Sequence, residues 1–132
     1  MTIQNDPIVY GTTIFVGSMP VTITYGKFMS YTYQNLINKS YIIALVSGKV
    51  DGDTPIYCRV HSSCVTSETL GALDCDCCPQ MEGALKIISE KGGIFFYLLQ
   101  EGRGCGYVGK SRACMLVQSS GDKLDTFEAY RQ

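Results

Sequence analysis

The sequence contains no tryptophan, a single histidine and no apolar run of about 18 residues, so a membrane-spanning helix is not expected. There is also no excess of charge of one sign, because 11 Lys and Arg residues are balanced by 12 Asp and Glu residues, for a net charge of −1. A broad basic field that would recruit nucleic acid or an anionic membrane is therefore excluded. Any anion-binding site must be local.

The N-terminus lacks a basic stretch ahead of a long apolar run, and Asp6 and Pro7 interrupt it. No secretory signal peptide is expected, and the sequence predicts a cytoplasmic protein. Seven cysteines, an odd number, then indicate free thiols or metal ligands rather than a disulfide framework. With 132 residues, 45% of them hydrophobic, the chain is expected to form one domain with a substantial core.

Alternating apolar and polar residues dominate residues 8–33, in segments such as TIFVG and VTITYGKFMSYTY, and predict antiparallel strands. The next run, YIIALVSGKV, predicts a buried strand that ends at the turn DGD. The alternating segment TPIYCRVHSS is then expected to be its hairpin partner.

The hydrophobic period changes after this point. VTSETLGAL predicts a short helix, and CPQMEGALKIISEKGG predicts a longer one. Pro79 suits the first turn of the longer helix, Met81, Leu85 and Ile88 recur at helical spacing, and the pair Gly92–Gly93 ends it.

Two more segments complete the pattern. IFFYLLQ predicts a further buried strand, and KSRACMLVQ predicts another helix. The fold class expected from this order is mixed α/β (α+β), a single domain with N-terminal antiparallel strands followed by helix–strand units. Near the end, DTFE predicts a helix start with Asp125 and Glu128 as a capping box. Only four residues follow, so we expect either that the chain once continued or that this end docks on something.

The stretch GCGYVGKS, Gly104–Ser111, fits the phosphate-loop pattern G-x-x-x-x-G-K-[ST] and follows a predicted strand. A phosphate loop also needs an acidic magnesium partner on a later strand. The 21 residues after Ser111 contain no such strand. The pattern therefore favours a glycine-rich turn that leads into a helix.

The residues just before this stretch are more informative. Gln100, Glu101 and Arg103 come directly after the predicted strand, where ligand sites of α/β proteins lie. Glu101 can accept hydrogen bonds from the amidine group of a nucleotide base, and Arg103 can form paired bonds with a phosphate. Arg59, Lys110 and Arg112 are further cations available to a phosphate, although each can also be a solvated surface charge.

Cys64, Cys75 and Cys77 form the pattern C-x10-C-x-C. Thiolates at this spacing can converge on one cation, for which zinc is the natural candidate. Three protein ligands would leave a fourth position for water, as in catalytic zinc sites. A structural site with His61 or Cys78 as fourth ligand, and simple burial of the thiols, stay open. For the remaining Cys58, Cys105 and Cys114 we expect ordinary packing.

The segment RVHSSC, followed by VTSETLGAL, DCDC and CPQ and then by QEGRG, GY and K, resembles the GTP cyclohydrolase II family of riboflavin biosynthesis. The resemblance runs from about Val21 to the last residue and joins several motifs in order. It makes residues 1–132 one cyclohydrolase II-like domain, in which about the first 20 residues are an N-terminal extension.

The resemblance implies a zinc-dependent hydrolase that opens the imidazole ring of GTP at C8 and releases formate and pyrophosphate. It also implies Mg²⁺ on the phosphates and a homodimer. The residues that match the family's zinc ligands are Cys64, Cys75 and Cys77. Those that match its substrate-binding positions are Arg59, Val60, His61, Ser62, Ser63, Gln80, Glu101, Gly102, Arg103 and Thr126.

Several positions depart from the family pattern. Ser63 stands where the family usually has Glu, Cys78 where it has Gly, and Cys114 where a Tyr helps catalysis. A serine is a weaker proton carrier than a carboxylic acid. The Asp and Arg that the family uses as base and in phosphate attack would lie beyond Gln132, so the catalytic residues stay unknown, and we expect a fragment or a natural short form.

Other functions stay open beside the hydrolase. One is a non-catalytic module that binds zinc and a guanine nucleotide and leaves the nucleotide intact. A second is a family variant with a different substrate or product. A third is a purely structural zinc domain, in which four protein ligands would surround the metal.

Overall fold

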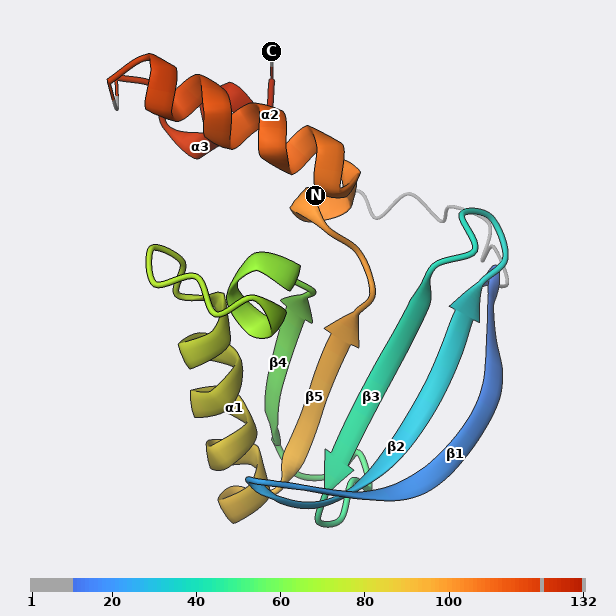
Figure 1. The fold of residues 1–132 in the computed structure, drawn as a ribbon. Coiled ribbons are helices and arrows are strands. Elements are labelled where there is room, and N and C mark those ends of the chain that lie inside the picture. The colour runs from blue at the N-terminus through green and yellow to red at the C-terminus, as the bar shows by residue number, and fades with distance from the viewer. Residues whose placement is uncertain (1–10, 122, 132) are drawn as a thin grey trace, which may run out of the picture.

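The computed structural model describes residues 11–121 and 123–131 and begins with an antiparallel meander (Figure 1). Strands β1 (Thr13–Ile23), β2 (Gly26–Asn35) and β3 (Tyr41–Ser47) pair in sequence order. The predicted antiparallel strands are confirmed over the described residues, while residues 8–10 of the predicted range lie outside them. A two-residue turn splits the predicted segment VTITYGKFMSYTY, because Ile23 pairs directly with Gly26.

The order of the five strands corrects the predicted hairpin. β4 (Tyr57–Ser62) does not pair with β3; β5 (Gly93–Leu98) lies between them, antiparallel to β3 and parallel to β4. The sheet order is β1-β2-β3-β5-β4. β5 has apolar residues on both faces, which favours a central position. β4 and β5 are joined by a helix, which is how parallel neighbours are connected.

The connecting helix α1 (Cys77–Lys91) covers one face of the sheet, as Figure 1 shows. Its residues Leu85 and Ile88 pack with Phe28 and Phe95 in the buried core. The helix ends as predicted at Gly92, whose φ of 82° is a conformation that glycine adopts without strain.

The segments that follow β4 and β5 lie at the same end of the sheet (Figure 1). A single π-type turn, η1 (Val65–Thr69), follows β4, where a short helix was predicted. After β5 come the 3₁₀ turn η2 (Gly102–Gly104) and α2 (Gly106–Ser119), which begins earlier than predicted. The carboxyl ends of two parallel strands and the helices after them therefore surround one region.

The last element, α3 (Thr126–Ala129), packs against α2. Its predicted capping box is present, with Asp125 accepting from the backbone N–H of Glu128 and the Glu128 carboxylate accepting from that of Asp125. This short helix is thus stabilised by tertiary contact as well as by its cap. Among the described residues, no helix combines the length and the apolar character needed to cross a membrane.

Candidate metal centre and nucleotide cleft

A cavity of about 740 Å³ lies at the carboxyl ends of β4 and β5. Its walls come from β4, from the segment between β4 and α1, from the first turn of α1, and from η2, α2 and α3. The three predicted zinc ligands, Cys64, Cys75 and Cys77, line the cavity. So do nine of the ten predicted substrate-binding residues, which are Arg59, Val60, His61, Ser62, Ser63, Gln80, Gly102, Arg103 and Thr126.

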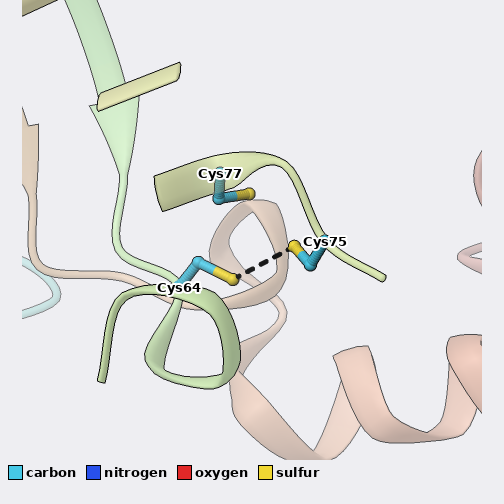
Figure 2. A group of neighbouring side chains, drawn as sticks. All are labelled: Cys64, Cys75 and Cys77. Carbon is cyan, nitrogen blue, oxygen red and sulfur yellow. Dashed lines mark hydrogen bonds between the residues drawn. The ribbon is translucent and has the colours of Figure 1, made fainter. Parts of the chain in front are cut away.

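The three cysteines converge at the floor of this cavity. Their sulfur atoms lie within 4.8 Å of one another, and the sulfurs of Cys64 and Cys75 are 3.7 Å apart. Figure 2 shows the side chains of Cys64, Cys75 and Cys77 turned toward one another, Cys64 from the segment after β4 and the other two from the segment that leads into α1. Sulfurs that bind one zinc ion at about 2.3 Å in a tetrahedron lie roughly 3.8 Å apart. The spacing therefore fits a zinc ion without rearrangement of the Cys64–Cys75 pair.

A buried serine holds the loop that carries two of these cysteines. The hydroxyl of Ser67, in η1, donates to the carbonyl oxygen of Cys75 at 3.0 Å and accepts from the backbone N–H of Cys78 at 2.9 Å. Ser67 is buried, and both its donor and its acceptor capacity are used. The first turn of α1 is in this way fixed to the turn that follows Cys64.

Neither of the two residues considered as a fourth ligand belongs to the cluster. The thiol of Cys78 points to Glu82, and His61 Nε2 lies 2.6 Å from the Glu68 carboxylate. Tyr97 donates to the other oxygen of Glu68 at 2.5 Å. Within the described residues the candidate metal-ligand set is thus the three cysteines alone.

Lys110 is hydrogen-bonded to the triad. Its ammonium donates to Cys64 Sγ at 2.9 Å, to Thr66 Oγ1 at 3.1 Å and to Glu101 Oε2 at 3.1 Å. Burial raises the pKa of the Cys64 thiol, but the bonds from Lys110, Thr66 and the backbone of Ser67 outweigh it and lower the pKa to about 7.

Cys77 differs from Cys64. Burial raises the pKa of the Cys77 thiol to about 12, and the nearby sulfurs of Cys75 and Cys64 act in the same direction. Side by side in a partly buried site, three thiolates repel one another strongly unless a cation is bound. The donor set therefore suits a soft or borderline divalent metal, whose charge allows all three to ionise.

The rim of the cavity carries cationic side chains. The guanidinium of Arg59 donates to Gln80 Oε1 at 2.8 Å, and the Gln80 amide donates in turn to Asp76 at 2.7 Å. Arg103 has a left-handed φ of 56° and lies over the rings of Phe127 and Tyr130, with 5.7 and 5.5 Å to the ring centroids. Two guanidinium groups are thereby fixed at the cleft by neighbouring side chains.

The tenth predicted substrate residue is placed differently. Glu101 does not line the cavity; its carboxylate accepts from the backbone N–H of Val65 at 2.5 Å and from Lys110. The serines of the β4 end are also held by the loop after β5, because Ser63 Oγ donates to the carbonyl oxygen of Gln100 at 2.9 Å and Ser62 accepts from the Gln100 amide at 3.3 Å.

The structure also decides the phosphate-loop pattern. Gly109, Lys110 and Ser111 lie inside α2, not in a loop before it, so the glycine-rich turn leading into a helix is confirmed.

The expectation of ordinary packing for Cys58, Cys105 and Cys114 is wrong, because all three are exposed. Cys58 stays exposed because β4 is an edge strand. Cys105 and Cys114 stay exposed because α2 lies at one end of the sheet and not against its face.

Several residues at or beside the cavity were not predicted from the sequence. Thr66, Tyr107 and Tyr130 line its wall, and Ser67, Glu68 and Tyr97 form hydrogen bonds beside it. The signal for Glu68 was available, since a carboxylate sits in a segment predicted to lie beside the metal ligands. The pairing of Tyr97 with Glu68 depends on the strand order and had no local signal.

The comparisons agree with this picture. Residues 15–132 match the family model described as GTP cyclohydrolase II. The chain is 43% identical over 106 residues to the riboflavin biosynthesis protein RibBA of Bacillus cytotoxicus, which covers 80% of this chain and 26% of that protein. It is 37% identical over 122 residues to RibBA of Bacillus subtilis, covering 89% of this chain and 31% of that protein.

A solved structure also aligns with the chain. It is RibBX, a two-domain 3,4-dihydroxy-2-butanone 4-phosphate synthase from A. baumannii, with a TM-score of 0.44 and 20% identity over 68% of this chain and 23% of that one. The chain spans about a quarter to a third of the length of the RibBA relatives. Because the family model covers nearly all of it, the chain belongs to the GTP cyclohydrolase II family.

Proposed function

We propose that the chain is a zinc-dependent hydrolase that opens the imidazole ring of GTP and releases formate and pyrophosphate. One observation carries the proposal. The three cysteine sulfurs face the same cavity as nine of the ten residues that match the family's substrate positions. A metal site and a nucleotide site in one cavity is the arrangement that hydrolysis of a guanine ring requires.

Cys64, Cys75 and Cys77 would hold the zinc ion. Zinc bound by three protein ligands supplies a Lewis acid that lowers the pKa of a bound water toward neutrality. The chain's own contribution is to keep the thiols fixed, through Ser67 on one side and Lys110 on the other. The remaining walls include Val60, Ala72 and Met115, which add apolar surface for a purine ring.

The rim residues would bind the rest of the nucleotide. Arg59 and Arg103 supply positive charge for the triphosphate, which we propose carries Mg²⁺, and their partners Gln80 and Tyr130 fix their orientation. Ser62 and Thr126 place hydroxyl groups at the cavity. Glu101 supports the loop from below, through Val65 and Lys110.

A second candidate function is a module that binds the nucleotide without hydrolysing it. The observation that favours it is Cys114, which lines the cavity where the family usually has a catalytic tyrosine. A thiol has a shorter reach than a phenol and a different proton affinity. Tyr107 and Tyr130 also line the cavity, so a phenol is available from other positions.

The family resemblance further suggests a homodimer, and one feature of the sheet supports it. The face turned away from α1 carries apolar residues on four strands, among them Val60, Phe96, Val46 and Met29. Val60 is 59% exposed and Met29 is 40% exposed. Light scattering of the purified chain would give its mass directly, and a monomer at all concentrations would contradict the dimer.

The proposed function is tested by a product assay on the full chain. The protein is loaded with zinc, GTP and Mg²⁺ are added, and formate and pyrophosphate are measured separately, with Cys77→Ser as the control. Both products, absent in the control, are the expected result. Neither product, with GTP still bound, would replace the hydrolase by the binding module, and formate alone would limit the activity to ring opening.

A further inference from the structure

Lys110 is the one lysine or arginine among the described residues that hydrogen-bonds a cysteine of the triad. Its side chain is only 16% exposed, as is that of Glu101. The ammonium has three hydrogen atoms to donate, and it has three partners within 3.1 Å: Cys64 Sγ, Thr66 Oγ1 and Glu101 Oε2. Its donors are therefore fully used inside the protein wall.

The backbone around Lys110 is shaped for this position. Gly102 has a φ of 58°, and a Cβ added there would lie 3.1 Å from Lys110 Cβ and 3.4 Å from its backbone nitrogen. The absence of a side chain at Gly102 lets α2 approach the loop after β5 closely. Lysine side chains in helices project back toward the N-terminal end, which here is the end nearest Cys64.

Glu101 anchors the ammonium and ties it to the metal loop. One carboxylate oxygen accepts from Lys110 at 3.1 Å, and the other accepts from the backbone N–H of Val65, the residue after Cys64. The two side chains thus join the loop after β5, the second turn of α2 and the start of η1. The start of η1, directly after Cys64, is thereby held from the side of α2, as Ser67 holds it to the segment of Cys75 and Cys78.

Building on the proposed zinc site, we propose that Lys110, anchored by Glu101, is a positioning residue for the metal centre. It holds the Cys64 sulfur against the other two sulfurs and draws electron density from it, instead of binding a phosphate of the substrate. A hydrogen bond to a thiolate ligand weakens its donation to the metal, so the metal remains a stronger Lewis acid. The lysine of the phosphate-loop pattern thereby has a different task from the one that the pattern names.

The rival assignment is that Lys110 binds the triphosphate. That role would require the ammonium to leave three partners and a largely buried position. Lys110 lines the cavity as well, but its ammonium has three partners, whereas the guanidinium groups of Arg59 and Arg103 are held by Gln80 and by aromatic rings. The two assignments predict different losses when the ammonium is removed.

The test compares Lys110→Met, Lys110→Arg and Glu101→Gln with Lys86→Met, which removes an exposed lysine from α1. Zinc affinity of each full-length variant is measured by competition with a chromophoric chelator. We expect Lys110→Met to weaken zinc binding roughly 10- to 100-fold, as loss of partners around metal ligands does, because the loss of the fixed position of Cys64 outweighs the stronger donation of its sulfur. Lys110→Arg and Glu101→Gln should lose less, and Lys86→Met should match the parent chain.

A second readout separates an electronic effect from a general loosening. With Co²⁺ in place of zinc, the thiolate-to-cobalt charge-transfer band should move to lower energy in Lys110→Met, because Cys64 becomes a stronger donor. Circular dichroism shows whether each variant is folded. If Lys110→Met does not fold, Glu101→Gln and Lys110→Arg decide the matter by the same two measurements.

The outcomes separate this inference from the proposed function. If the parent chain itself binds no zinc, the metal site and this inference both fall. If the parent binds zinc while Lys110→Met keeps its zinc affinity and cobalt spectrum but loses GTP affinity, the hydrolase proposal stands and Lys110 is a phosphate ligand. Weaker zinc binding with a shifted cobalt band, at unchanged GTP affinity of the metal-free chain, supports the positioning role.

Discussion

The two ends of the parallel pair β4–β5 differ in how closely their backbones pack. The amino ends of both strands form the starting end of the pair, and their carboxyl ends form its finishing end. At the starting end, Tyr57 is paired with Gly93, and a Cβ on Gly93 would lie 2.1 Å from the Tyr57 carbonyl oxygen. At the finishing end, Ser62 is paired with Leu98, and polar residues follow both strands. At the starting end the two backbones pack too closely to admit a side chain at Gly93. At the finishing end the side chains surround a cavity.

Burial follows the same division along β4. The residues of its first half are exposed, because β4 is an edge strand, whereas His61 near the finishing end is 3% exposed. The buried position is polar and is satisfied by Glu68, which also accepts from Tyr97 on β5. The molecule thus places its buried polar network under the site and its tightest backbone contact away from it.

The largest expected effect is a loss of zinc affinity at the finishing end. Cys77→Ser removes one of three thiolates and should weaken zinc binding by on the order of 10³-fold, or about 4 kcal/mol, while the fold persists. Isothermal titration of zinc into the metal-free chain measures this. Cys58→Ser, which changes an exposed cysteine on β4, is the control and should bind like the parent. Equal affinity of both variants would remove Cys77 from the ligand set.

The next largest expected effect is a loss of stability at the starting end. Gly93→Ala introduces a methyl group against the Tyr57 backbone at a φ of +141°, which should lower the free energy of unfolding by on the order of 3 kcal/mol. Urea unfolding measures it. The control Gly83→Ala, on α1 with nothing within 4 Å of its Cβ, should instead add about 0.5–1 kcal/mol. Equal stability of the two variants would contradict the close packing.

A smaller effect is expected from the buried network that joins the two strands. Tyr97→Phe removes the hydroxyl that donates to Glu68 and should cost about 1.5–3 kcal/mol of unfolding free energy, since the acceptor is a buried carboxylate. Tyr41→Phe, at a position that is 42% exposed, serves as the control and should change stability by less than about 0.5 kcal/mol. A neutral Tyr97→Phe would show that the carboxylate is satisfied without it.

The smallest effect concerns the rim. Arg59→Met should weaken GTP binding about 10-fold, or about 1.4 kcal/mol, because it removes a guanidinium from a partly solvated site. Zinc affinity should be unchanged, since Arg59 contacts Gln80 and not the cysteines. The exposed Lys27→Met on β2 provides the control for a general loss of positive charge. A loss of GTP affinity as large in the control would assign the effect to net charge.

Local sequence patterns predicted most elements. The alternation in β1 and β2, the spacing of Leu85 and Ile88 in α1, and the capping box of Asp125 and Glu128 each depend on neighbours in the chain. The error lay in pairing β3 with β4. Both segments have the pattern of strands, but β5, which follows α1 later in the chain, lies between them in the sheet, and a local pattern does not specify the order of strands.

The sequence by itself determined the candidate metal-ligand types and the motifs of the family, because residue identity fixes which atoms can bind zinc or pair with phosphate. The tertiary structure decided how those atoms are used. It paired Lys110 with Glu101 and Cys64, paired His61 with Glu68, and left Cys114 exposed at the cavity. The physical reason is that charges near the protein interior take the nearest partners that the fold provides, and those partners come from distant parts of the chain.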